Sequence, residues 1–320
     1  MKVAALDLGS NTFLCLIAEV SNDKITQIYS DTVEIVRLGQ GLETTKKFHP
    51  EALLRADLCL QKFSEVIHKH QPEKILAMAT SAARDAQNKE ELSMLLKKYN
   101  IPLEIIAGEK EAAITYQGAV SGLVAPNKNL MLIDIGGGST EFIFGFAQKL
   151  IKGESLNIGC VRLTEKFITL QPTSDFEIAQ VTEHIDAAIQ KAKLSQPEGF
   201  LLEQIIAVAG TPTTLVAAEL GYFDAEKIDK SVLTQKNLQH WFDKLKKATV
   251  EEKVNMGIPR GRADIILVGV LILMRSLHIF GLKELSVSTR GVRYGIALEL
   301  GADSGLIAPK NYFLQLLKKK

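Results

Sequence analysis

A glycine-rich turn that follows a short apolar segment occurs twice in this chain of 320 residues. The first copy is LDLGSNT from Leu6, and the second is IDIGGGST from Ile133. After both copies come two further apolar segments, a stretch with helical periodicity and another apolar segment, in the same order. Because chance does not reproduce both the turn and this order, the repeat predicts a duplicated supersecondary unit.

The repeat predicts an α/β fold with the element order βββαβα in each half. The length suggests two domains, and the repeat gives them similar folds that face each other across a cleft. The expected elements, in pairs from the two halves, are second strands at 13–20 and 141–147, third strands ending at 36–38 and 161–163, helices at 51–70 and 175–193, and fourth strands beginning at 74 and 204.

Each turn has the chemistry of a phosphate site. Asp7 and Asp134 stand at the ends of the apolar segments, and glycines and hydroxyl residues follow them. Successive N–H groups of a glycine-rich turn bind anions, and a carboxylate at the strand end can hold a metal ion against phosphate oxygens. The turns match neither the dinucleotide fingerprint nor the P-loop. A tight glycine hairpin explains one copy alone equally well, so the second copy is what favours a phosphate site.

The global composition excludes several other classes. The formal net charge is +1, which predicts neither a nucleic acid nor a membrane partner. Cys15, Cys59 and Cys160 are too few and too scattered for a disulfide framework or a zinc site, and this pattern suits the reducing cytoplasm. The longest apolar run, 265–274, is too short to span a bilayer and predicts a buried helix.

Charged residues also stand at two other predicted strand-to-helix junctions. Arg84 falls in a first helical turn, where a cation is unfavourable unless an anion or a carboxylate such as Asp85 lies nearby. Glu109 and Glu111 begin the helix that leads to the second glycine-rich turn, and the helix dipole favours carboxylates there. If the repeat is interpreted correctly, Glu111 points into the cleft.

The last half adds hydroxyl and arginine donors. Gly210 and Thr211 offer N–H and hydroxyl groups at a strand-to-helix turn, although threonine caps explain that turn as well. Four arginines lie within two residues of a glycine in GIPRGRADIIL and STRGVRYG. Arginine forks bind phosphate or carboxylate in bidentate fashion, so these four are a candidate anion wall, with pairing to Asp264 and Glu299 as the alternative. The four are Arg260, Arg262, Arg290 and Arg293.

Eight short motifs in this sequence resemble the exopolyphosphatase and guanosine pentaphosphate phosphatase (Ppx/GppA) family of the actin, Hsp70 and sugar-kinase superfamily. The resemblance runs from the first strand to about Gly301. The chain is similar in length to the short, two-domain members of the family. It implies two ribonuclease-H-like (actin-like ATPase) domains around a cleft, domain I formed by 1–121 plus 302–320 and domain II by 122–301. The motifs are DLGSNT, ATSAARDAQN, GEKEAA, DIGGGSTE, GCVRLTE, GTPTTLVA, GRADIIL and STRGVRYG.

The resemblance implies hydrolysis of a terminal phosphoanhydride. Glu111 matches the catalytic carboxylate that activates water, and Arg84 matches an arginine beside the scissile phosphate. Asp134 and Glu141 match acids that hold Mg²⁺, with Mn²⁺ as another metal that would fit. The candidate substrate-binding residues are Asp7, Gly9, Ser10, Asn11, Thr12, Gly136, Gly137, Gly138, Ser139, Thr140, Gly210 and Thr211.

The implied substrates are inorganic polyphosphate, which would lose its terminal phosphate, and guanosine pentaphosphate, which would become the tetraphosphate of the stringent response. We expect a cytoplasmic homodimer that binds neither nucleic acid nor membrane. Five departures from the commoner family pattern leave substrate choice, chain-length preference and rate open. These are Leu14, Lys110, Ala113, Thr289 and Tyr294, which replace residues that are charged in many members.

Two other functional classes remain open on the sequence. One is an ATP-dependent kinase of the same superfamily, which would use an aspartate base near a sugar pocket. The other is a non-catalytic sensor that binds polyphosphate or guanosine pentaphosphate. A sensor needs no base, so Glu111 favours the enzyme.

Overall fold

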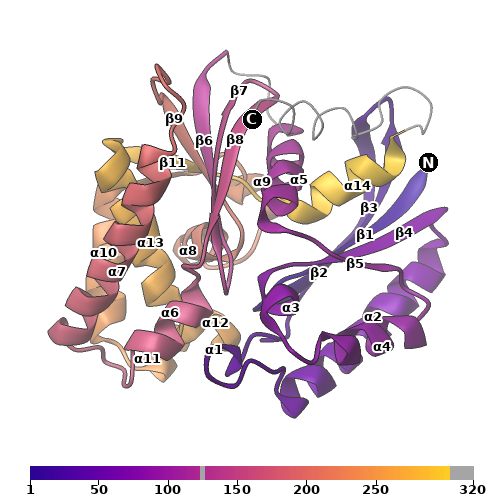
Figure 1. Ribbon diagram of the computed structural model, residues 1–320, viewed down its shortest axis with the longest axis horizontal. Helices are drawn as coiled ribbons and strands as arrows, with labels where there is room; N and C mark the ends of the chain where they lie inside the picture. Colours follow the sequence, from indigo (N-terminus) through magenta and orange to yellow (C-terminus); the bar gives the residue numbers. More distant parts are fainter. Residues whose placement is uncertain (123–126, 303–320) are drawn as a thin grey trace.

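The computed structural model describes residues 1–122 and 127–302, which form two lobes, each built around one mixed β-sheet (Figure 1). The expected return of residues 303–320 to the first domain lies outside the described residues. Within the described ranges, no helix has both the length and the apolar character that crossing a membrane requires.

The first sheet has the strand order β3-β2-β1-β4-β5. β1, β2 and β3 form an antiparallel meander, and β4 and β5 extend it in parallel on the other side of β1. Because β1 and β4 are parallel neighbours, their carboxyl ends meet at one edge of the sheet. The strands are β1 (Lys2–Leu8), β2 (Thr12–Ser21), β3 (Lys24–Ile35), β4 (Lys74–Ala79) and β5 (Leu103–Ile105).

The second sheet repeats this topology. Its order is β10-β11-β9-β6-β7-β8, so that β8, β7, β6, β9 and β11 take the places of β3, β2, β1, β4 and β5, and β10 is an additional edge strand. The duplicated βββαβα unit predicted from the repeat, and the two ribonuclease-H-like domains that the resemblance implied, are therefore confirmed. The strands are β6 (Asn129–Ile135), β7 (Thr140–Phe146), β8 (Lys149–Leu156), β9 (Gln204–Val208), β10 (Val232–Thr234) and β11 (Glu284–Val287).

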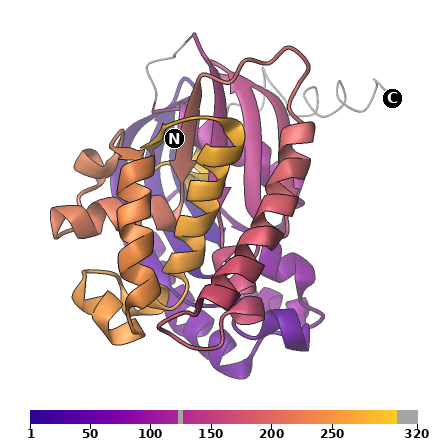
Figure 2. The same ribbon diagram turned by 90° about the vertical axis from the view of Figure 1, so that its left-hand side faces the viewer.

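Helices cover the outer face of each sheet. In the first lobe, Leu60 and Phe63 of α2 pack with Phe13 and Ile17 of β2, and α4 lies beside α2. In the second lobe, α7 and α10 both pack against α13, and Figure 2 shows these three helices side by side. The helices of the first half are α1 (Leu42–Thr45), α2 (Pro50–His70), α3 (Ser81–Asp85), α4 (Lys89–Lys98) and α5 (Gly108–Val120).

The second half contains more helices than the first. α13 confirms the buried helix predicted at 265–274, since most of its side chains belong to the core of this lobe. The helices are α6 (Cys160–Phe167), α7 (Asp175–Leu194), α8 (Gly210–Leu220), α9 (Ala225–Ile228), α10 (Gln235–Lys247), α11 (Val250–Asn255), α12 (Arg260–Ala263), α13 (Ile266–Phe280) and α14 (Val292–Gly301).

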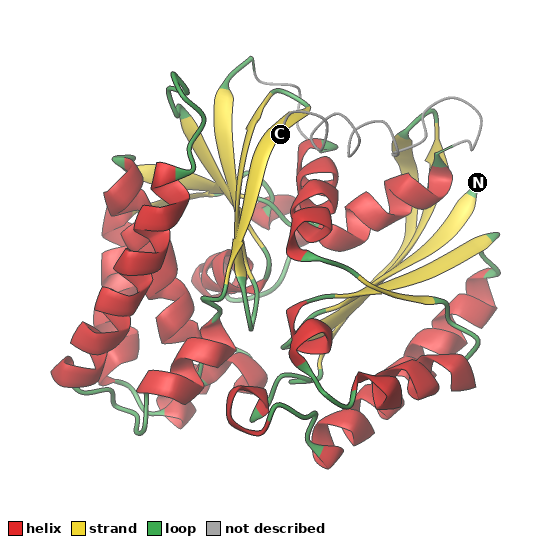
Figure 3. Cartoon of the chain, in the orientation of Figure 1, coloured by secondary structure: helices red, strands yellow, loops and turns green. Residues whose placement is uncertain are grey.

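α5 and α14 lie between the two sheets (Figure 3). α5 packs on the second sheet, where Ala112 and Tyr116 join the core of β6 and β7, and α14 packs on β1 and β2 of the first sheet. The two helices approach so closely that a Cβ at Gly118 would lie 2.2 Å from the carbonyl oxygen of Gly291. The domain boundaries expected at 121 and 302 stay a prediction.

One expected element was wrong. Residues Val161–Leu163 do not end a third strand, because β8 stops at Leu156 and these residues lie in α6. α6 begins where the amides of Cys160 and Val161 donate to the carbonyls of Gly136 and Gly137, so the second glycine-rich turn itself anchors the helix. In the first half the equivalent strand, β3, ends at Ile35, directly before the expected 36–38.

Candidate active site

Four carboxylates meet where the two halves face each other. Asp134 and Glu141 are direct partners across β6 and β7, so their side chains project from the same face of the sheet. Glu111, in the first turn of α5, and Asp7, near the end of β1, are close enough to act on the titration of this pair or of each other. The structure therefore brings together the acids that the sequence assigned to both turns and to the catalytic position.

Burial makes these acids difficult to ionise. It raises the pKa of Asp134 to about 7, and the neighbouring charge of Glu111 adds to that shift. Burial also raises the pKa of Asp7 and of Glu141 well above the usual range, with further contributions from the nearby acids. A cluster of this kind is stabilised by a cation, because a positive charge offsets both the lost hydration and the mutual repulsion.

Arg84 provides one such cation. Its Nη1 donates to Glu111 Oε2 at 2.6 Å and to the carbonyl of Ile106 at 2.9 Å. Burial raises the pKa of Glu111, and the Arg84 charge opposes that rise. The sequence offered an anion or a nearby carboxylate as the reason for a cation in α3. In the structure that carboxylate is Glu111 rather than the neighbouring Asp85.

The two glycine-rich turns have the same backbone arrangement. Gly9 N donates to Thr12 O at 3.1 Å, and Gly136 N donates to Ser139 O at 2.9 Å. Each glycine lies two residues after its aspartate, so the two turns are equivalent residue by residue.

The turns also touch each other across the halves. A Cβ at Gly138 would lie 2.5 Å from Ser81 Oγ and 3.1 Å from Ser10 Oγ, so a larger residue would separate them. Gly137 similarly lies against Ser10. Asn11 is buried, and its Oδ1 has no hydrogen-bond partner within the described residues, which leaves an acceptor available to a ligand or to water.

The predicted hydroxyl donors divide into two groups. Ser139 is buried beside Glu141 and favours its ionised form, and Thr12 Oγ1 accepts from Arg262 Nη2 at 3.1 Å. Thr140 instead donates to the carbonyl of Ile158, and Thr211 packs against Gly269 of α13, so neither side chain joins the acids. For these last two, the structure does not bring the predicted hydroxyl into the site.

Gly210 has a different role from the one expected. A Cβ at this position would fall 1.2 Å from Arg262 Nη1, so only glycine leaves room for the guanidinium. Arg262 therefore lies between the start of α8 and Thr12 of the first turn.

The other three arginines do not form one anion wall with Arg262. Arg260 pairs with Glu251 at an exposed site, Arg293 binds both oxygens of Asp31 at 2.7 and 2.9 Å, and Arg290 lies over the ring of Tyr294. The carboxylates proposed as their partners are also engaged elsewhere, since Asp264 pairs with Arg37 and Glu299 with Lys110.

The departures from the family pattern have local partners. Lys110 donates to Glu104 at 2.7 Å, although it is the neighbour of Glu111 in sequence. Thr289 N donates to Asp229 at 3.1 Å, and Tyr294 OH donates to Asp31 at 3.1 Å. Leu14 is the direct partner of Asp7 across β1 and β2 and is partly exposed.

Sequence reasoning missed two residues that support the acids. Thr115 Oγ1 donates to Asp134 Oδ2 at 3.4 Å, and Ser155 Oγ donates to Glu141 Oε1 at 2.7 Å. A signal existed for the first, because Thr115 lies one helical turn after Glu111 and so shares its face. Ser155 is the β8 partner of Glu141, and its role required the strand register.

The donor set fits Mg²⁺. Asp134 and Glu141 are buried, adjacent and oxygen-bearing, and their raised pKa values show that a nearby positive charge would stabilise the ionised pair. The described residues contain no group of three or more potential ligands placed to hold a metal. An ion held here by one or two carboxylates would take its remaining ligands from substrate phosphates and water.

The duplicated sheets and their paired turns define a two-domain protein of the actin-like fold class. Comparison identifies the particular family: residues 16–302 match the Ppx/GppA phosphatase family, and the chain belongs to it. It is therefore placed in a family of hydrolases.

Individual proteins to which the chain is similar agree with this family assignment. The chain is similar to exopolyphosphatase 2 of Mycobacterium tuberculosis, with 32% identity over 320 residues, 93% of this chain and 98% of that one. It is 36% identical over 309 residues to the bifunctional 3-dehydroquinate synthase/phosphatase of Fusobacterium nucleatum. That match covers 92% of this chain but only 46% of the relative, so the chain spans about half of that protein. The solved Aquifex aeolicus member of the Ppx/GppA family has a TM-score of 0.79 and 29% identity, covering 96% of this chain and 99% of that one.

Proposed function

We propose that the protein hydrolyses the terminal phosphoanhydride of inorganic polyphosphate, of guanosine pentaphosphate, or of both. The observation that carries this proposal is Glu111, a buried carboxylate paired with Arg84 and set among the acids of both Asp-Gly turns. The names of the family and of the Mycobacterium relative support this substrate class.

Glu111 is the group that would accept a proton from water. Water attacks the terminal phosphorus, the anhydride P–O bond breaks, and the leaving oxygen remains on the shortened chain. Phosphoryl transfer of this kind needs positioning and neutralisation of spread negative charge more than covalent chemistry. A general base within reach of the water contributes about 10²- to 10⁴-fold in rate.

Arg84 would move its charge from Glu111 to the phosphate. In the structure the Arg84 guanidinium donates to Glu111, and a phosphate would compete for the same N–H donors. The backbone N–H groups of the two turns would hold the remaining phosphate oxygens. Mg²⁺ held by Asp134 and Glu141 would supply additional neutralisation when bound.

The decisive experiment compares Glu111→Gln with the wild type. Phosphate release is measured from polyphosphate of defined lengths and from guanosine pentaphosphate, with Mg²⁺ and with chelator. We expect at least a 100-fold loss of kcat with little change in substrate binding, since the amide keeps the shape but cannot accept the proton.

Glu109→Gln is the matched control, because Glu109 stands in the same helical turn with an exposed side chain. Substantial turnover by a folded Glu111→Gln protein would move the base elsewhere. Phosphorylation of an added acceptor by ATP would indicate a kinase, and binding without turnover in the wild type would indicate a sensor. The cytoplasmic location and the homodimer stay predictions.

A further inference from the structure

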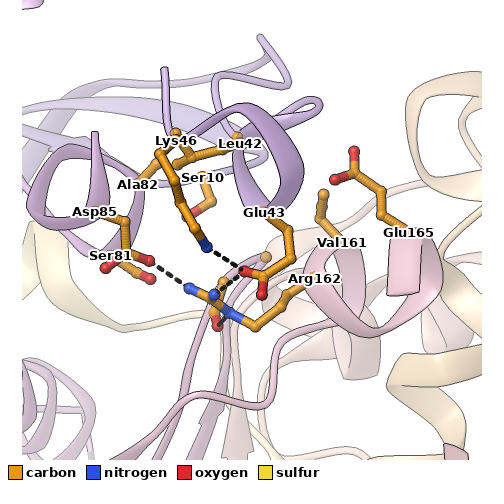
Figure 4. A pocket seen from close by; sticks show the side chains of 13 residues that line it. Ser10, Leu42, Glu43, Lys46, Ser81, Ala82, Asp85, Val161, Arg162 and Glu165 are labelled. Atoms are coloured by element: carbon orange, nitrogen blue, oxygen red, sulfur yellow. Dashed lines mark hydrogen bonds and ion pairs between the residues drawn. The ribbon is translucent and has the colours of Figure 1, made fainter. Parts of the chain in front are cut away.

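Arg162, in α6 of the second half, contacts the first half in a small pocket that both halves line (Figure 4). Its Nη1 donates to Glu43 of α1, and its Nη2 donates to Asp85 at the end of α3. Its Nε donates to the carbonyl of Gly138 at 2.7 Å. One side chain, only 16% exposed, therefore joins both halves and the second glycine-rich turn.

Each of these contacts bears on the candidate site. Asp85 follows Arg84 in the five-residue helix α3, so a bond that fixes Asp85 also fixes the backbone that carries the arginine. Gly138 lies against Ser10 and Ser81 of the first half, and its carbonyl is held by Arg162. Arg162 thus sets the relative position of two groups that would contact the same phosphate.

The small pocket around Arg162 is not itself an anion site. Arg162 and Lys46 line it with three carboxylates, Glu43, Asp85 and Glu165. Arg162 pairs with the first two, and Lys46 lies 3.5 Å from Glu43. With acids in excess, a polyanion would gain little here, and the ion pairs serve to hold the lobes together.

The excess of acids also makes the contact between the halves depend on the charge of Arg162. Without the guanidinium, Asp85 would lose its cation and Glu43 would keep only Lys46, so the acids of the pocket would be in greater excess and would repel each other. Glu165, also on α6, accepts from Gly41 N at 2.9 Å, so the same helix touches the first half at a second point. Opening the cleft at α6 requires breaking both contacts.

We propose that Arg162 is a positioning residue that, together with the Arg37–Asp264 ion pair, keeps the two halves closed on each other and holds Arg84 and the Gly136–Ser139 turn in their relative places. Its effect on hydrolysis rests on the proposed function, whereas its effect on closure does not. Arg162 touches neither base nor metal ligand, so its loss acts through the population of closed protein.

The experiment follows closure with a donor and acceptor dye on cysteines introduced at Leu54 of α2 and Phe176 of α7, which are 60% and 71% exposed. The native thiols are buried, and burial raises the pKa of Cys15 and Cys59 to about 12, so they react poorly at neutral pH. Distances are compared between wild type and Arg162→Gln without substrate. Arg275→Gln is the control, because Arg275 binds Asp186 in bidentate fashion with similar exposure but within one lobe.

We expect Arg162→Gln to lengthen the dye separation and Arg275→Gln to leave it unchanged. In phosphate release, Arg162→Gln should raise KM about tenfold with a smaller loss of kcat, because substrate binding must then supply the closure. Glu111→Gln should show the opposite split, a large loss of kcat with little change in substrate binding. An unchanged dye separation in Arg162→Gln would overturn the proposal, as would a loss confined to kcat.

A double-mutant cycle tests the named contact. Asp85→Asn should lengthen the separation less than Arg162→Gln does, and the double variant should be no worse than Arg162→Gln alone, since both changes break one interaction. Additive effects would overturn the assignment of Asp85 as partner. If the wild type hydrolyses neither substrate, the dye measurements still test closure, so failure of the proposed function is recognised separately.

Discussion

The two Asp-Gly turns share a backbone but differ in the residue opposite the aspartate. In the second half, Asp134 faces Glu141 across the strand pair, and in the first half Asp7 faces Leu14 at the same register. Duplication therefore supplied two equivalent positions, and one side chain decides what each can bind. A pair of carboxylates suits a metal ion, whereas a single carboxylate beside an apolar group does not.

The strand-to-helix junctions differ in a related way. In the first half, β4 leads through Thr80 into the short α3, which presents Arg84 to Glu111. In the second half, β9 leads through Ala209 into α8, where Gly210 leaves space for Arg262. Both junctions thus place an arginine between the halves. Arg84 belongs to the first junction itself, whereas Arg262 comes from α12 and fits beside Gly210 of the second junction. Equivalent backbone positions need not hold equivalent residues.

The largest expected difference separates the two aspartates. We expect Asp134→Asn to lower kcat/KM on the order of 100-fold and to raise the Mg²⁺ concentration for half-maximal rate, because several kcal/mol of charge stabilisation depend on the metal. Asp7→Asn should lower activity about tenfold without moving the Mg²⁺ midpoint, as loss of a non-ligand in the site would. Phosphate release at a series of Mg²⁺ concentrations measures both. Equal midpoint shifts in the two variants would show that the halves share the metal.

A smaller effect is expected from making the halves alike. Leu14→Glu places a second carboxylate opposite Asp7, and the added negative charge should raise KM about tenfold, which corresponds to roughly 1.4 kcal/mol of repulsion. Leu14→Gln has nearly the same shape without the charge and should bind substrate almost as the wild type does. Initial rates over a range of polyphosphate concentrations distinguish the two variants. Equal KM values in both would mean that position 14 is remote from the substrate.

The sequence predicted those features of the fold and the site that depend on the order of the elements and on the pattern of apolar residues. The repeat located both sheets, and the Asp-x-Gly pattern brought Asp7 and Asp134 to one cleft, because each aspartate stands near the end of the first strand of its sheet. Burial of 265–274 followed from its apolar run. These features are local or repeated, so composition and spacing carry them.

Contacts between distant segments could not be predicted this way. The crossing of α5 and α14 depends on Gly118 meeting Gly291, and the ion pair of Arg162 joins α6 to α1 and α3. The stretch around Val161 looked like a strand end by analogy with the first half, but its amides bond to the glycine turn and begin a helix. In each case a contact between segments distant in sequence determines the local structure, and the periodicity of apolar residues does not encode such contacts.

The smallest expected effect is on stability, at the two junctions. Ala209 has φ 70° and ψ −162°, a region almost confined to glycine, whereas Thr80 has φ −112°. Ala209→Gly should stabilise the protein by about 1 kcal/mol, because relief of roughly 1–3 kcal/mol of strain exceeds the entropy that glycine adds to the unfolded chain. Thr80→Gly should destabilise it, since the same entropy is lost there without any strain to relieve. Thermal unfolding of both variants, each beside the wild type, gives the comparison. A lower unfolding midpoint for Ala209→Gly would show that contacts of the alanine methyl outweigh the backbone strain. Glycine would then destabilise both junctions, despite their different φ values.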